Sequence, residues 1–98
     1  MPALRSPRKL RSQALILHVA AGNAGASRVG LVAPKRLARL SVDRNRLKRL
    51  AREAFRRHPV RDAGLDLVLA LRQPFTRESE AAWLAQVREL LGRAAEGR

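Results

Sequence analysis

The chain has 98 residues, and its 21 lysine and arginine residues against 8 acidic residues give a formal net charge of +13. A hydrophobic content of 46% is enough for one packed core and argues against wholesale disorder. The absence of cysteine excludes disulfide scaffolds and thiolate metal sites, and no apolar run approaches the roughly 20 residues of a membrane span. Such a charge on so small a domain predicts an anionic partner, nucleic acid before a membrane surface.

The positive charge is concentrated in the first part of the chain. Residues 1–60 hold 15 basic residues and only two acids, whereas residues 61–98 hold six of each sign. From Lys35 to Arg57 there are ten basic residues and two acids. Most of the basic residues are arginines, whose planar guanidinium binds phosphate oxygens through paired hydrogen bonds and stacks on bases. We therefore expect the binding function in the first part and ordinary scaffold in the second.

The predicted elements, in chain order, follow from hydrophobic periodicity and from the positions of glycine and proline. They are a basic flexible arm (1–12), a strand (Gln13–Ala20), a turn (Ala21–Ala26), a strand (Ser27–Ala33), a basic connector (Pro34–Val42), a helix capped by Ser41 or Asp43 and ending near His58, a strand (Leu65–Leu71) and a last helix (about 77–95). The first two strands most simply pair as an antiparallel hairpin, because Gly22, Asn23 and Gly25 suit a tight turn.

The order β–β–α–β–α predicts a single α+β domain over residues 13–98, built as one sheet with helices packed against it. The strand Leu65–Leu71 is almost continuously apolar, which suits a strand covered on both faces. The β–α–β unit from Ser27 to Leu71 would by default have a right-handed crossover with parallel strands.

A helical wheel of residues 43–58 separates an apolar face from a cationic one. The apolar face, expected to pack on the sheet, consists of Leu47, Leu50, Ala51, Ala54 and Phe55. The opposite face carries Asn45, Arg49, Arg52 and Arg56, bordered by Arg44 and Lys48 on one side and by Arg46 and Arg57 on the other. Like charges four residues apart repel by a few tenths of a kcal/mol per pair, so stability alone would favour interspersed acids.

A solvated surface explains most charged helix faces, but it does not account for the missing acids here. Asn45, in the middle of the stripe, offers both a donor and an acceptor, which can read a base edge or a 2′-hydroxyl. Catalysis by this chain is not indicated: its two histidines, His18 and His58, suit structural roles, and no carboxylate pair or glycine-rich phosphate loop is present.

Residues 44–56 read RNRLKRLAREAFR, which resembles the signature helix R-N-R-x-K-R-x-x-R-E-x-F-R of the protein subunit of bacterial ribonuclease P. Upstream, Val29–Arg36 resembles the strand and basic pair that precede this helix in the family, at a fitting distance. Downstream, Gly64–Leu69 resembles the next strand, and a last helix follows in order. The resemblance covers roughly residues 14–95.

The family resemblance implies a small α/β sandwich like the second domain of a small-subunit ribosomal protein, with a left-handed β–α–β crossover. This expectation replaces the right-handed default, which is only a frequency. Members usually have a helix before the first strand. Here Leu10–Ser12 runs almost directly into Gln13–Leu15, so we expect that helix to be shortened or absent.

The function implied by the resemblance is that of a protein cofactor, which binds the catalytic RNA and assists removal of the 5′ leader from precursor tRNA. The RNA carries out the hydrolysis with Mg²⁺, which RNA and substrate phosphates mainly hold. The resemblance also implies a cytoplasmic protein with no membrane and no obligate protein partner. The expected RNA-binding residues, from the signature, the connector and the outer helix face, are Lys35, Arg36, Arg39, Arg44, Asn45, Arg46, Lys48, Arg49, Arg52 and Arg56.

Three alternatives stay open from the sequence. The chain can be a structural RNA-binding protein of ribosomal or assembly-factor type, which binds RNA without affecting cleavage. It can also be a divergent or truncated family member impaired in leader binding, because its aromatics, Phe55, Phe75 and Trp83, are absent from the strands expected to face the leader. A membrane-active or DNA-binding basic domain is the third alternative.

Overall fold

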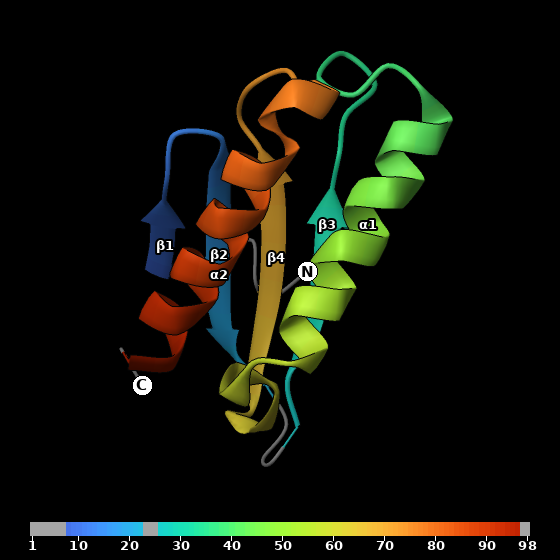
Figure 1. Cartoon of the computed structure of the whole chain (residues 1–98). Coiled ribbons are helices and arrows are strands. Elements are labelled where there is room, and N and C mark those ends of the chain that lie inside the picture. The colour runs from blue at the N-terminus through green and yellow to red at the C-terminus, as the bar shows by residue number, and fades with distance from the viewer. Residues whose placement is uncertain (1–7, 23–25, 97–98) are drawn as a thin grey trace.

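A four-stranded sheet carries two α-helices on one face in the computed structural model, which describes residues 8–22 and 26–96 (Figure 1). The elements are β1 (Arg8–Arg11), β2 (Leu15–Ala21), β3 (Arg28–Val32), α1 (Ser41–Arg56), the short 3₁₀ helix η2 (Pro59–Asp62), β4 (Leu65–Leu71), the 3₁₀ turn η3 (Arg77–Ser79) and α2 (Glu80–Glu96). The predicted α+β class is confirmed.

The strand order is β1-β2-β4-β3, so β4 lies inside the sheet. It pairs antiparallel with β2, with Leu69 opposite Leu17, and parallel with β3, with Leu69 opposite Leu31. The sequence predicted a strand covered on both faces: Leu67, Val68 and Leu69 are indeed buried, but among the described residues both α-helices lie on one face of the sheet.

The predicted hairpin between the first two long strands is wrong. The prediction paired strands β2 and β3 across the turn at Ala21–Ala26. In the sheet, β4 lies between these two strands. A turn sequence indicates where the chain reverses direction, but it does not determine which strands pair in the sheet. An apolar strand such as β4 buries most of its surface when it has a strand on each side. Residues 23–25, at the middle of that turn, lie outside the described residues.

The basic arm expected over residues 1–12 is wrong for its last part. Strand β1 (Arg8–Arg11) pairs antiparallel with β2 at the sheet edge, and Leu10 packs against the core opposite Leu17. Arg8 and Leu10 are part-buried while Lys9 and Arg11 are exposed, so a period of two is present but short. Charged side chains on a short edge strand also discourage pairing with another chain. Residues 1–7 lie outside the described residues.

The β3–α1–β4 crossover is left-handed, as the family resemblance implied. In Figure 1 the helices lie in front of the sheet, β3 and β4 both point upward, and β4 lies to the left of β3. A chain that crosses in front of the sheet through α1 and returns as the strand on the left turns in the left-handed sense. The default right-handed expectation is thereby corrected.

One core lies between the sheet and the two helices. Its buried residues are Leu15, Leu17, Val19, Leu67, Leu69 and Leu71 from the sheet, Ala38, Leu47, Ala51, Ala54 and Val60 from the crossover region, and Trp83, Val87, Leu90, Leu91 and Ala94 from α2. The Trp83 ring meets Phe75 edge-to-face with ring centres 6.3 Å apart. This geometry suits aromatic quadrupoles and closes the core below the start of α2.

Helix α1 begins at Ser41, but neither Ser41 nor Asp43 caps it with a side-chain hydrogen bond. The capping position is Leu40, which has an extended backbone, and its carbonyl accepts the backbone N–H groups of Asp43 and Arg44. The helix ends at Arg56, before the predicted end near His58. His58 instead caps η2, where its Nδ1 accepts the Val60 N–H at 3.0 Å. Pro59 is the first residue of η2, consistent with its inability to continue α1.

Within residues 8–22 and 26–96, no helix precedes the basic helix α1. The chain from β1 enters β2 through a tight connection in which the Ser12 N–H donates to the Leu15 carbonyl at 2.9 Å. The Ser12 hydroxyl and the Ala14 N–H both donate to the Gln86 side-chain oxygen, at 2.6 and 2.8 Å, which attaches this connection to α2.

The Leu69→Ala variant tests the central position of β4. Leu69 is fully buried between β2, β3 and the helices, so its truncation should lower the free energy of unfolding by about 2–5 kcal/mol. Leu40→Ala is the matched control, because Leu40 is 60% exposed and its loss should change stability by less than about 0.5 kcal/mol. Urea unfolding followed by circular dichroism measures both, and equal effects would contradict the described core.

Candidate nucleic-acid interface

Helix α1 presents four different surroundings to its side chains. Leu47, Ala51 and Ala54 are buried against the core, while Leu50 and Phe55 pack at its margin, as the wheel predicted. One flank faces α2, the opposite flank lies beside β3, and the remaining side faces outward. The two buried alanines let the α1 backbone lie close to the core, so its charged residues project from a firmly seated helix.

Arg44 closes the connector that precedes α1. One terminal nitrogen of its guanidinium donates to the carbonyl of Ala38 at 2.9 Å and to that of Arg39 at 3.1 Å. Ala38 is itself buried, so these bonds fix a loop that Pro34 begins by accepting the N–H groups of Leu37 and Ala38. Arg44, predicted to bind RNA, is therefore held to the backbone of the connector through one nitrogen of its guanidinium.

Arg46 faces α2 and is held by an acid. Its guanidinium binds the Glu80 carboxylate through two bonds, Nε to Oε2 at 2.6 Å and the second nitrogen to Oε1 at 2.9 Å. The hydrogen bond from Arg46 lowers the pKa of Glu80, and the same bond raises the pKa of Arg46. A second ion pair, Arg77 Nε to Asp43 Oδ1 at 3.4 Å, lies beside it. The two pairs join the first half of α1 to η3 and to the first residue of α2.

The last turns of α1 hold a second charge cluster. Glu53 pairs with Arg57 at 3.2 Å and lies 3.9 Å from an Arg56 nitrogen. Arg57 is on the flank toward α2, and the Arg56 carbonyl accepts a bond from Arg61 at 2.7 Å. Both arginine side chains are mostly exposed, and the shorter distance makes Arg57 the better neutralised of the two.

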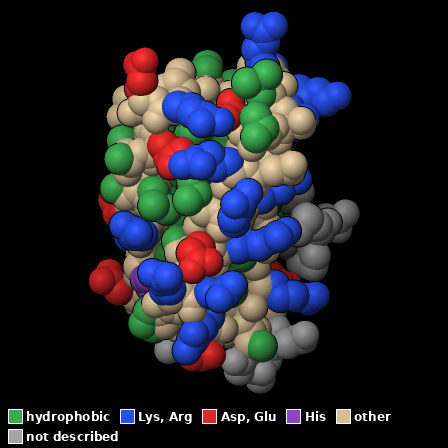
Figure 2. Space-filling model, turned by 45° about the vertical axis from the view of Figure 1, so that its right-hand side comes forward, with side chains coloured by type: hydrophobic (Ala, Val, Ile, Leu, Met, Phe, Trp, Pro, Cys, Tyr) green, Lys and Arg blue, Asp and Glu red, His purple; other side chains and the backbone are tan. Residues whose placement is uncertain are grey.

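The predicted site residues without an internal partner lie on the other sides of α1 and on the connector that precedes it. Among the described residues, those predicted site residues that form no hydrogen bond or ion pair through their side chains are Lys35, Arg36, Arg39, Asn45, Lys48, Arg49 and Arg52. All seven are exposed. Figure 2 shows blue side chains following this helix down one face of the molecule. The structure thus brings the predicted residues together and separates free cations from acid-bound ones.

A hollow beside β3 extends this free surface. It has a volume of about 210 Å³ and lies between Lys48, Ala51 and Arg52 of α1 and Val29–Leu31 of β3. Gly30 has open space where a side chain would project. These strand residues were not among the predicted site residues. The available sequence signal was Gly30, because a glycine inside a strand often marks a close approach by another backbone.

The two histidines have structural surroundings. His58 caps η2, and His18 lies on β2 opposite Lys9. Burial, followed by the nearby Lys9 charge, lowers the pKa of His18, so its ring is neutral near pH 7. Within residues 8–22 and 26–96 no three His, Asp or Glu side chains group as metal ligands, and no helix in this part of the chain is long and apolar enough to span a membrane.

The fold and the site define a small basic α+β domain with a surface of cations that have no internal partner among the described residues. The family model described as Ribonuclease P matches residues 2–95, and the chain belongs to this family of protein subunits. The resemblance drawn from residues 44–56 is thereby confirmed.

Known members are similar over most of the chain. The ribonuclease P protein component of Nitrosomonas europaea is 46% identical over 71 residues, which are 72% of this chain and 60% of that protein. The component of Nitrosomonas eutropha is 38% identical over 94% of this chain and 78% of its own length. A solved structure, the RNase P protein from Thermotoga maritima, has 26% identity and a TM-score of 0.71, covering 95% of this chain and 88% of that one.

These comparisons confirm the predicted role at the level of the family, that of the protein cofactor in tRNA 5′ processing. The chain is thus a component of an endoribonuclease complex that also contains the ribonuclease P RNA. The overall fold agrees with that of these structural relatives, with a TM-score of 0.71 for each of the two Thermotoga maritima structures.

Glu80→Gln tests the ion pair between α1 and α2. Because Arg46 lowers the folded-state pKa of Glu80, the pair stabilises the fold above the unfolded-state pKa. That contribution is lost as the pH falls through the lowered folded-state pKa of Glu80. The melting temperature of the unaltered protein should therefore fall more steeply with acid than that of Glu80→Gln.

Glu89→Gln is the control for this experiment, since Glu89 is exposed on the same helix and forms no ion pair with a described residue. Its acid dependence should match that of the unaltered protein. Identical profiles for all three proteins between about pH 7 and about pH 3 would show that the Arg46–Glu80 pair does not contribute to stability.

Proposed function

We propose that this chain binds the catalytic RNA of ribonuclease P through the free cations of α1 and its connector, and so assists removal of the 5′ leader from precursor tRNA in the cytoplasm. The observation that supports the proposal is that the acid-bound arginines of α1 and its unpartnered cations lie on different sides of the helix. Acid-bound arginines lie toward α2, whereas Lys48, Arg49 and Arg52 have no internal partner. A surface selected only for solubility has no need to keep its acids on one flank.

The free side chains suit phosphates on a folded RNA. Lys48 and Arg52 lie one helical turn apart, about 5–6 Å between their Cβ atoms, and therefore reach neighbouring phosphates of one strand. Arg49 and Asn45 project outward beside them and reach a different part of the RNA. The guanidiniums position the helix on the backbone, while the Asn45 amide can bind a base edge or a ribose hydroxyl.

Mg²⁺ in this proposal is held by phosphates of the RNA and the substrate. The bound metal supplies an activated water and neutralises charge on the phosphate that is cleaved. The cations of α1 act on the RNA: they neutralise backbone phosphates and displace counterions, which lowers the repulsion between RNA strands brought close together.

The face of the sheet opposite the two helices is the proposed surface for the precursor tRNA leader. Its cross-strand row runs from Lys9 through His18 and Val68 to Gly30, and Arg28 lies on the same side beside Asp66. None of the described residues on this face is aromatic. Lys9 supplies charge for leader phosphates, and His18, neutral near pH 7, supplies hydrogen bonding without charge.

The experiment that tests the proposal is reconstitution with a bacterial ribonuclease P RNA. At low Mg²⁺, the protein should increase precursor-tRNA cleavage by the RNA. Binding without stimulation would favour the structural RNA-binding alternative, and no stimulation at any protein concentration would rule out the cofactor role.

Arg49→Ala should reduce the salt dependence of RNA binding by about one unit in the slope of log K against log salt, because it removes one free phosphate contact. Arg46→Ala is the matched control on the same helix, and it should change the slope less because Glu80 already neutralises Arg46. Filter binding at several salt concentrations measures both slopes. Equal slopes for the two variants would contradict the division between free and acid-bound cations.

Asn45→Ala tests the one neutral residue of the free surface. Its loss should weaken RNA binding by about 0.5–1.5 kcal/mol, the usual contribution of an uncharged hydrogen bond, with the salt slope unchanged. The same filter-binding series gives both quantities. A slope change equal to that of Arg49→Ala would show that Asn45 has no separate role.

A further inference from the structure

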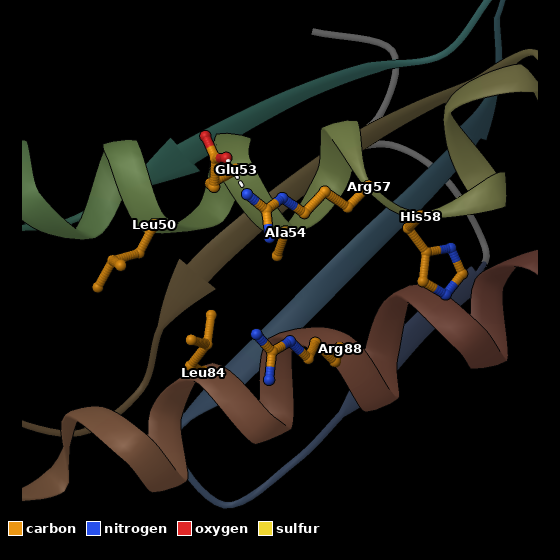
Figure 3. A pocket seen from close by; sticks show the side chains of 7 residues that line it. All are labelled: Leu50, Glu53, Ala54, Arg57, His58, Leu84 and Arg88. Atoms are coloured by element: carbon orange, nitrogen blue, oxygen red, sulfur yellow. Dashed lines mark ion pairs between the residues drawn. The ribbon is translucent and has the colours of Figure 1, made fainter.

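The groove between α1 and α2 lies outside the free cationic surface. It has a volume of about 300 Å³ and is lined by Leu50, Glu53, Ala54 and Arg57 of α1, His58 after its end, and Leu84 and Arg88 of α2. Figure 3 shows Leu50 and Leu84 facing each other from the two helices, with Arg57 and Arg88 on opposite walls and His58 at one end. The groove is thus a two-helix site with an apolar part and cationic walls.

The apolar part of this groove suits a flat, weakly polar ring. Leu50 and Leu84 are part-buried at the margin of the core, and Ala54, which lines the same groove, is buried and small. The volume is at the lower limit for small-ligand pockets, which fits one ring system and not a folded protein segment. An arginine guanidinium stacks on a nucleobase as well as binding phosphate, so the walls and the apolar part suit the same ligand.

The charges favour an anion. Arg57 is paired with Glu53 at 3.2 Å, whereas Arg88 forms no hydrogen bond or ion pair with any described residue. The residues three and four positions from Arg88 on α2 are Leu84, Ala85, Leu91 and Gly92, so its own helix offers it no acid. The two guanidiniums outweigh the single carboxylate, and an entering phosphate would complete the charge balance.

The end of the groove adds a directed donor. Because the His58 Nδ1 accepts the Val60 N–H, the hydrogen of the neutral ring is assigned to Nε2. A side chain at Gly92 would begin 3.9 Å from this nitrogen, so glycine leaves space around it. The Nε2–H group can therefore donate to a polar ligand at this end.

We propose that this groove binds one unstacked nucleotide of an RNA strand, with its base on Leu50, Ala54 and Leu84 and its phosphate between Arg57 and Arg88. The inference rests on the proposed function for the nature of the polymer and adds a second contact region to it. Helix α1 carries the free cations on one side and a groove wall on the other, so a strand that crosses this helix reaches both.

The test is a titration of the isotope-labelled full chain with adenosine 5′-monophosphate, followed by nuclear magnetic resonance. The amides of Leu50, Ala54, Leu84 and Arg88 should shift together and saturate. Arg88→Ala should weaken binding about tenfold, as expected for one charge-assisted bond. Arg93→Ala, an equal charge change at an exposed position of the same helix outside the groove, should weaken binding less than about twofold.

Two further probes identify what the groove recognises. Inorganic phosphate should bind at least about tenfold more weakly and leave the Leu50 and Leu84 amides unshifted, because it has no base. Shifts confined to Lys48, Arg49 and Arg52, equal affinity for phosphate, or stronger binding of an oligoglutamate peptide would each overturn the proposal. So would unchanged affinity in Arg88→Ala, with folding of the variant checked by thermal unfolding.

The titration uses the protein without catalytic RNA, and its outcome is independent of the cleavage assay. If cleavage is not stimulated but the groove amides shift and Arg88→Ala weakens binding, the groove proposal stands and the cofactor role fails. If cleavage is stimulated and the groove does not respond, the reverse holds.

Discussion

Repulsion among the cations of α1 is the constraint on which the surface of this protein depends. Arg44, Lys48, Arg52 and Arg56 follow one another at four-residue intervals, an arrangement that weakens an isolated helix. The helix persists because Leu47, Ala51 and Ala54 seat it in the core and because acids neutralise the flank toward α2. Stabilisation on one flank permits an uncompensated positive surface on the other.

The same arrangement explains why α2 has a balanced charge. Glu80 at its start binds Arg46 of α1, and Arg77 just before α2 binds Asp43 of α1, so one acid and one cation of the second half of the chain each neutralise a partner on α1. Charge that looks like ordinary scaffold in the sequence therefore determines which arginines of α1 remain free. Recognition and packing are linked through these few ion pairs.

Most helices and strands can be predicted from local sequence patterns, but the pairing of the strands in the sheet cannot. The period of α1, the apolar run of β4 and the end of α1 before Pro59 are local signals, and all three were predicted. Strand β1 is too short and too basic to show its period, and the insertion of β4 between β2 and β3 depends on burial over the whole sheet. The handedness of the crossover came from family resemblance and not from any residue pattern.

In the candidate site, too, local patterns predict which face of the helix a residue occupies but not its partners on other elements. The wheel placed the cations of α1 on the correct faces, because a helix repeats every 3.6 residues. It could not separate Arg46 from Arg49, because the partner of Arg46 is Glu80, on a different helix. Arg44 is a similar case, since its carbonyl partners belong to a connector whose shape no periodicity describes.

The inner position of β4 has a consequence for how the protein forms during synthesis. Strand β2 pairs along its whole length with β4, Leu15 with Leu71 at one end and Ala21 with Leu65 at the other. Until the ribosome has made β4, β2 has only the short β1 beside it, and β3 has no neighbour in the sheet. The nascent chain must therefore keep two apolar strands apart from other chains until its middle strand emerges.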